Sequence, residues 1–184
     1  MGELTERLAA LDLRVTTPDD VASAHLRGWT DVSVSLAPGY YAHTSAERLA
    51  PRLADLAALV CEARESSYWR AMSDSIGYDV RGSAVPPAPG DPLAEGRASL
   101  VAEGASSDGR VSATTAGLRT WTFTLPRDVT SEFDEASFCS AVSQALSQTL
   151  VDHAERLVDL SIGAARDLDP RARSILRQVL GSVV

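Results

Sequence analysis

The chain contains no lysine and no asparagine, and aromatic residues make up only 5% of its 184 residues. All 17 basic residues are therefore arginines, and the 25 acidic residues leave a net charge of −8. With few aromatics, we expect a core built mainly from Leu, Val and Ala. The acidic balance disfavours nucleic acid as a partner, because non-specific affinity for DNA comes from basic groups that neutralise phosphates.

Long apolar runs and export signals are also missing. No stretch approaches about 18 apolar residues, so we expect no membrane-spanning helix and no membrane partner. Residues 1–6 have neither the basic nor the apolar segment of a secretory signal, which predicts a cytoplasmic protein. Cys61 and Cys139 form no CxxC pattern, so we expect reduced core thiols rather than a disulfide or a zinc site.

The usual signatures of catalysis are absent from the sequence. His25, His43 and His153 lie in different predicted elements, and no HxxxH or HExxH spacing occurs. Asp152-His153 with Glu155 is a weak metal or base candidate, because a metal site needs three or four converging ligands. No GxSxG elbow, GxGxxG loop or Walker A motif is present. We therefore predict no enzyme, no catalytic residue, no metal and no cofactor.

Two segments of the chain are similar at a constant offset of 89 residues. Residues 17–36 align without a gap to residues 106–125, and the same offset continues through the helix predicted after each segment. The matched positions include Asp19/Asp108, Ser23/Ser112, Gly28/Gly117, Val34/Phe123 and Leu36/Leu125. The sequence therefore predicts two copies of one structural unit.

The first copy has the pattern of three strands followed by a long helix. Alternating apolar residues predict strands at 11–15, 21–27 and 32–36, with turns between them. A capping box at Thr44–Glu47 precedes a helix with apolar residues at spacings of three and four. Pro51 is expected in the first turns of this helix or at a kink, because it lacks an N–H. A short helix at about 2–10 precedes the strands.

The second copy repeats this plan, and two further segments have no counterpart. Strands are expected near 97–104, 110–116 and 118–125, with a long helix over about 134–166. The Pro-rich segment 77–93 predicts an extended linker between a first module, 1–76, and a second, 94–184. Asp169-Pro170 is a typical helix start, and it predicts an extra C-terminal helix over about 170–183.

The turn Ser106–Gly109, the strand Leu118–Leu125 and the helix after it resemble the YbaB/EbfC family over residues 97–166. A degenerate version of the turn, Thr17–Ser23, extends the resemblance over residues 11–75. It implies small homodimeric modules, several of which bind DNA without strict sequence preference, and hence a tandem chain that forms a fused pseudo-dimer. The long helix that precedes the strands in that family is missing or shortened here.

A fainter resemblance links the same meander-and-helix pattern, together with the acidic charge, to accessory proteins of actinobacterial type VII secretion loci. The two resemblances imply different partners. The first implies DNA, and the second implies another protein. Residues 1–75 carry seven arginines against eleven acidic residues, and residues 94–184 carry nine against twelve, so neither module is basic.

Two groups of residues are candidates for partner binding. Tyr and Trp are enriched at interface hot spots, which favours the aromatic pairs in a loop and late in the first long helix. These residues are Tyr40, Tyr41, Tyr68 and Trp69. The one locally basic segment is a candidate for contacts with nucleic acid or an acidic partner, although a solvated helix face would look the same. Its residues are Arg166, Arg171, Arg173 and Arg177.

The sequence thus predicts an α+β protein of two tandem three-stranded antiparallel meander-plus-long-helix modules that form a pseudo-dimer. The expected function is a non-enzymatic protein-interaction module, an adaptor or chaperone-like accessory factor with a role in secretion as one option. The alternative is a nucleoid-associated DNA-binding protein of the YbaB/EbfC type. Both a monomer with an internal pseudo-two-fold and a homodimer remain open, since an isologous interface could be satisfied within one chain.

Overall fold

The computed structural model describes residues 2–77, 79 and 90–164, and it has an α+β fold built from two copies of one unit. The first copy contains, in order, α1 (Gly2–Ala9), β1 (Asp12–Thr16), β2 (Ala22–Arg27), β3 (Asp31–Leu36), η1 (Tyr41–His43) and α2 (Ala46–Ile76). The second contains α4 (Pro92–Ser99), β4 (Val101–Ala105), β5 (Ser112–Ala116), β6 (Thr120–Thr124), α5 (Val129–Glu132) and α6 (Glu135–Ala164).

The repeat at an offset of 89 residues is confirmed in the strands and their pairing. β1–β2–β3 form sheet A and β4–β5–β6 form sheet B, both antiparallel and in sequential order. The register is the same in both sheets, since Ala24 pairs with Val34 and Ala113 pairs with Phe123. Each copy is therefore a meander followed by one long helix.

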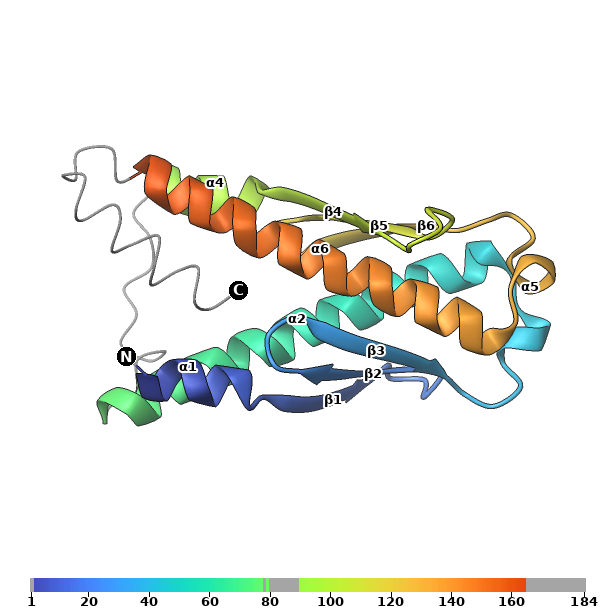
Figure 1. The fold of residues 1–184 in the computed structure, drawn as a ribbon, viewed down its shortest axis with the longest axis horizontal. Helices are drawn as coiled ribbons and strands as arrows, with labels where there is room; N and C mark the ends of the chain where they lie inside the picture. Colours follow the sequence, from blue (N-terminus) through green and yellow to red (C-terminus); the bar gives the residue numbers. More distant parts are fainter. Residues whose placement is uncertain (1, 78, 80–89, 165–184) are drawn as a thin grey trace.

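The two long helices lie between the two sheets (Figure 1). α2 packs on β1 and β2 of its own copy and also on β6 of the second copy. α6 packs on β4 and β5 of its own copy and on β3 of the first. A helix that covered only its own sheet would leave the last strand of that sheet bare. The two copies therefore interlock as a pseudo-dimer, and each sheet needs both helices to bury its apolar face.

A single core joins the two copies. The inward-facing residues of both sheets and the apolar faces of α2 and α6 belong to one buried cluster. Ten of its largest fully buried side chains, drawn from both copies, are Leu26, Leu49, Leu53, Leu56, Val60, Val111, Phe138, Val142, Leu146 and Leu150. Leu and Val dominate this set, as the composition predicts, and only one of the ten is aromatic.

The prediction of a strand near 97–104 is wrong at its first residues, because α4 extends to Ser99 and β4 begins at Val101. Asp91 caps this helix by accepting a hydrogen bond from the Leu93 N–H at 3.0 Å, and Pro92 occupies the first turn. α4 is the counterpart of α1, so the repeat includes a short leading helix. Most of the linker and the helix predicted at 170–183 lie outside the described residues.

Candidate functional site

Helix α6 supplies hydrogen-bond acceptors to the outer edge of β3. The Val34 N–H donates to the Ser143 hydroxyl at 2.8 Å, and the Val32 N–H donates to Ser147 at 3.0 Å. The Leu36 N–H lies against the thiol of Cys139 in the same way. Cys139, Ser143 and Ser147 are spaced by four, so one face of a helix meets alternate residues of a strand. The edge of sheet A at β3 is therefore covered.

A second row of α6 side chains covers the outer edge of β4. The Glu103 N–H donates to Asp152 at 2.9 Å, and the Ala105 N–H donates to Gln148 at 3.3 Å. Two residues beyond the strand, the Ser107 N–H donates to Gln144 at 3.0 Å. These acceptors are again four residues apart along the helix. α6 thus takes the place of a neighbouring strand for both β3 and β4.

Close contact between β4 and α6 depends on Gly104. A Cβ at residue 104 would lie 2.4 Å from the Thr149 backbone nitrogen and 2.5 Å from the Ala145 carbonyl oxygen. Both distances are far below van der Waals contact, so only glycine permits this approach. In the first copy, the residue equivalent to Gly104 is Val15.

The outer edge of β1 is organised differently. The Thr17 N–H bonds to Ala22 and the Gly28 N–H bonds to Leu11, so the odd-numbered residues of β1 are those that bond to β2. The backbone N–H and C=O groups of successive residues point to opposite sides of a strand. Those of Asp12, Arg14 and Thr16 therefore face outward, away from β2. No hydrogen bond to the outward N–H groups of Arg14 and Thr16 occurs among residues 2–77, 79 and 90–164. We call the outward backbone of residues 12–16 the open edge.

The difference between β1 and β4 follows from the residues on the long helices. The α2 positions equivalent to Gln144, Gln148 and Asp152 hold Asp55, Leu59 and Ala63. Leu59 and Ala63 offer no side-chain acceptor, and Asp55 is exposed without a hydrogen bond to β1 in the described part of the chain. Val15 also prevents the close approach that Gly104 allows. Asp12, Arg14 and Thr16 are all exposed as a result.

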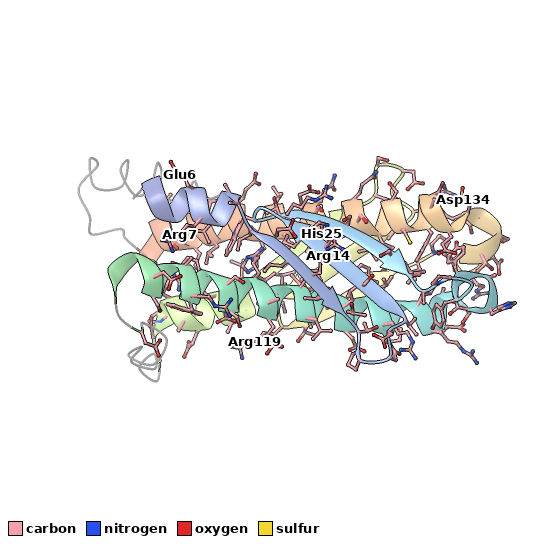
Figure 2. All side chains as sticks on the ribbon, turned by 90° about the horizontal axis from the view of Figure 1, so that it is seen from below. Glu6, Arg7, Arg14, His25, Arg119 and Asp134 are labelled. Atoms are coloured by element: carbon pink, nitrogen blue, oxygen red, sulfur yellow. The ribbon has the colours of Figure 1, made fainter. Side chains whose placement is uncertain are left out.

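The surface beside the open edge carries charges of both signs. His25 Nε2 lies 2.8 Å from the Asp12 carboxylate on the neighbouring strand, and Figure 2 shows His25 and Arg14 close together on this face. The hydrogen bond with His25 lowers the pKa of Asp12, and Arg14 and Arg27 add to the effect. Asp12 is therefore ionised at neutral pH and stands beside a cationic Arg14.

The turn that carries the family resemblance forms a rigid polar structure beside a shallow depression of about 440 Å³. The Ser106 hydroxyl donates to Asp108 at 2.6 Å, and Arg110 Nε donates to the same carboxylate at 2.7 Å. These bonds lower the pKa of Asp108 to about 2. Arg110 also stacks on the Phe133 ring at 3.9 Å. The polar groups of this turn are thus engaged with one another.

The first copy preserves the core of that turn. The Thr17 hydroxyl donates to Asp19 at 2.7 Å, and the Val21 N–H donates to the same carboxylate at 3.3 Å. Arg52 forms an ion pair with Asp19, in place of the Arg110 contact in the second copy. A hydrogen bond from a hydroxyl to an aspartate therefore stabilises the turn in both copies.

The predicted pair Tyr40 and Tyr41 is divided between surface and core. Tyr41 is 5% exposed, and its hydroxyl lies 2.8 Å from the Val129 carbonyl and 3.0 Å from that of Phe133. This places Tyr41 in the interface between the two copies. Tyr40 is half-buried, with the Arg52 guanidinium 5.9 Å from its ring centroid.

The predicted pair Tyr68 and Trp69 belongs to an aromatic cluster around a buried arginine. Tyr68 lies 6.1 Å from Trp29 and 5.3 Å from Trp69, measured between ring centroids. Arg64 is 6% exposed, stacks 4.3 Å above Trp29 and donates to the Trp29 carbonyl at 3.3 Å. Tyr68 and Trp69 are both half-buried, so part of each ring remains at the surface.

His153 is the repeat equivalent of Arg64 and is also buried, at 6% exposure. Its Nδ1 has no hydrogen-bond partner in the described part of the chain. Burial and the positive charge of Arg64 lower the pKa of His153 to about 4, while Asp152 acts in the opposite direction. His153 is therefore a neutral imidazole at pH 7.

The cysteines, the possible metal ligands and the C-terminal arginines are the remaining candidates from the sequence. Cys61 and Cys139 are free thiols, and burial raises the pKa of both to about 11. Within the described ranges no three His, Cys, Asp or Glu side chains are grouped as metal ligands, and no helix is long and apolar enough to cross a membrane. The basic candidates Arg166, Arg171, Arg173 and Arg177 lie outside the part of the chain that the structure describes.

Comparison of the chain with protein-family models, with curated proteins and with solved structures found no match. The chain's most distinctive local feature is the open edge of β1, which sequence reasoning did not single out. A signal for it was present in the repeat alignment, which pairs Gly104 with Val15 and the polar Gln148 with Leu59.

Proposed function

We propose that the protein is a non-enzymatic protein-interaction module that binds an extended segment of a partner protein along the open edge of β1. Such a module is an adaptor or a chaperone-like accessory factor. The observation that carries the proposal is the contrast between equivalent strands. The N–H groups of Glu103 and Ala105 on β4 bond to α6, whereas those of Arg14 and Thr16 on β1 face outward and have no such partner among the described residues.

An uncovered edge strand is a template for another strand, because its outward backbone groups are spaced for a new ladder. Strand addition at a sheet edge is a common mode of peptide recognition, in which the backbone bonds give affinity and the side chains give specificity. Soluble proteins usually cover such edges. Here both β3 and β4 are covered by α6, so the uncovered β1 favours a binding role.

Local charge supports a protein partner over DNA. Arg14 and Arg27 on the outer face of sheet A stand beside Asp12 and Asp31. Alternation of this kind offers a phosphate backbone no continuous basic surface, which non-specific DNA binding requires. The same alternation can be matched by charged side chains on a partner strand.

The test compares two substitutions at one position of the open edge. Thr16→Pro removes an outward N–H, and proline is tolerated on edge strands. Thr16→Ala removes the same side chain but keeps the N–H. Wild-type protein and both variants would be immobilised and exposed to extract from the native host, and the captured proteins would be quantified by mass spectrometry. Circular dichroism and thermal melting would verify that both variants are folded.

We expect one or a few proteins to be captured by the wild type and by Thr16→Ala, and to be lost with folded Thr16→Pro. Equal capture by all three proteins would overturn the proposal, because binding would then not need the backbone edge. A gel shift with random duplex DNA at low salt addresses the alternative function. Retardation that weakens steeply with salt would favour DNA binding.

A further inference from the structure

The proposed function leaves the chemistry of the partner segment open, and the open edge restricts it. Resting on that proposal, we infer that β1 selects an antiparallel segment in which apolar residues alternate with charged ones. An acidic residue lies opposite Arg14, and a basic residue two positions later lies opposite Asp12. The recognition element is thus apolar–acidic–apolar–basic–apolar, read from the N-terminus of the partner.

Backbone geometry defines the register. Arg14 is an outward residue, so the partner residue opposite it exchanges two hydrogen bonds with Arg14, one from each N–H. In an antiparallel pair the next outward pair lies two residues away on both strands, which places the second charged residue of the partner opposite Asp12. Thr16 faces the position two residues before the acidic one. The intervening partner residues turn their N–H groups away from β1.

Side chains on the outer face give the charge preference. Asp12, Arg14 and Thr16 are exposed on that face, and the Cβ atoms of directly opposed residues on paired strands lie about 5 Å apart. An acidic residue opposite Arg14 and a basic one opposite Asp12 each form a cross-strand ion pair. The reverse order places like charges opposite each other at both positions. Arg27 on β2 adds positive charge next to Asp12 and does not change this order.

Side chains on the inner face give the apolar preference. The alternate residues of β1, Leu13 and Val15, are half-buried and pack against the core. Leu59 and Ala63 of α2 are also half-buried, at the positions where α6 carries its β4-binding Gln148 and Asp152. Every second side chain of an added strand would therefore point toward this apolar surface of α2, as alternate side chains of β1 point toward the core.

A short segment fits this edge better than a second copy of the chain. In Figure 2, β1 crosses α2 obliquely, and the C-terminal part of the helix continues beyond the strand on its open side. If a second copy paired its β1 with this β1, its own α2 would enter the layer beneath the sheet that α2 of the first copy already occupies. A single strand adds no helix to that layer.

Defined peptides test the inference on the full-length protein. The matching peptide is Thr-Val-Glu-Val-Arg-Val-Thr, capped at both ends and labelled for fluorescence anisotropy. Its control, Thr-Val-Arg-Val-Glu-Val-Thr, has the same composition with the two charges exchanged. Two further peptides carry one N-methyl group each. One is methylated at the glutamate nitrogen, which faces β1, and the other at the valine that follows it, whose nitrogen faces away.

We expect the matching peptide to bind about tenfold more tightly than the charge-exchanged one, since two favourable pairs become two like-charge pairs. Methylation at the glutamate should abolish binding, and methylation at the valine should not. Hydrogen exchange at the Arg14 and Thr16 amides should slow when the matching peptide is bound. A double variant with Asp12→Arg and Arg14→Asp should prefer the charge-exchanged peptide.

Equal affinity for both peptides in the wild type, or no reversal in the folded double variant, would overturn the inference. Loss of host-protein capture in Thr16→Pro without any peptide binding would also overturn it, while leaving the proposed function in place. Sedimentation that shows a wild-type dimer and a Thr16→Pro monomer would assign the edge to a second copy and refute a peptide partner. Equal capture of host proteins by all variants would instead remove the proposed function itself.

Discussion

Gly104 lies directly against the backbone of Thr149, because a Cβ at residue 104 would stand only 2.4 Å from the Thr149 nitrogen. This contact brings β4 within hydrogen-bond reach of α6. Without it, the acceptors on Gln148 and Asp152 would lie too far from the strand to bond its N–H groups. Gly104 and the acceptors on α6 together thus make β4 a covered edge, and β1 lacks both.

Substitution Gly104→Ala should therefore separate β4 from α6. The clash is with backbone atoms, so the strand must move, at a cost of about 2 kcal/mol in the free energy of unfolding. Thermal melting should fall by about 5 °C, and hydrogen exchange at Glu103 and Ala105 should accelerate. Gly163→Ala is the matched control, since a Cβ there meets no atom of the described residues within 4 Å. An unchanged exchange rate at Glu103 in Gly104→Ala would contradict this account.

The depressed pKa of His153 predicts a loss of stability in mild acid. The folded protein holds this pKa near 4, against an ordinary value of 6.5. Between pH 6.5 and 4 the unfolded chain binds a proton at His153 that the folded chain does not. Stability should therefore fall as the pH falls through this window, by about 3 kcal/mol in total. Denaturant unfolding at a series of pH values measures the slope.

His153→Gln should flatten that slope, because glutamine does not titrate. His43→Gln, at an exposed position, controls for the loss of one histidine. The lowered carboxyl pKa values of Asp12, Asp108, Asp134 and Asp152 act mainly below about pH 5, so the slope between pH 6.5 and 5 reports on His153. A wild-type slope in folded His153→Gln would show that another group is responsible.

The hydroxyl of Tyr41 joins the loop before α2 to the short helix α5 of the other copy. Tyr41→Phe keeps the ring against Phe138 but removes the donor to the carbonyls of Val129 and Phe133. We expect a loss of about 1 kcal/mol in unfolding free energy, the usual contribution of one buried hydrogen bond. Tyr40→Phe is the control, with an expected change below about 0.5 kcal/mol. Equal effects of the two would argue against the inter-copy bond.

Both cysteines should react slowly while the protein is folded. Burial raises the pKa of Cys61 and Cys139 to about 11, and the thiolate is the reactive form. Treatment with iodoacetamide at pH 8, followed by mass spectrometry, should leave both thiols largely unmodified in buffer and modify both in guanidinium chloride. Rapid labelling of Cys139 in buffer would mean that its contact with the edge of β3 opens readily.

Much of the fold could be predicted from the sequence because each copy obeys simple periodic rules. Alternation over residues 32–36 and the spacing of Leu49, Leu53 and Leu56 correctly predict β3 and α2. The offset of 89 residues carries these predictions into the second copy. The exception is α4, where the strand expected from residue 97 ignores the Asp91-Pro92 helix start.

The arrangement of the copies and the open edge could not be derived in the same way. Periodicity shows which face of a strand is apolar, but it does not show which helix covers that face. The serines of α6 look like ordinary solvent-facing residues in the sequence, yet Ser143 and Ser147 bond to β3, more than a hundred residues earlier. Likewise, Tyr41 looks like a surface aromatic and is buried between the copies. Such facts depend on long-range packing.

Fusing the two copies in one chain has a consequence for binding stoichiometry. A symmetric dimer of identical subunits would present two equivalent edges, both covered or both open, and so would bind partners in pairs or not at all. The tandem chain is free to differ at equivalent positions, with Gly104 on one side and Val15 on the other. Of the equivalent strands β1 and β4, only β1 is therefore open. At this pair of positions the chain can hold one partner strand without crosslinking two.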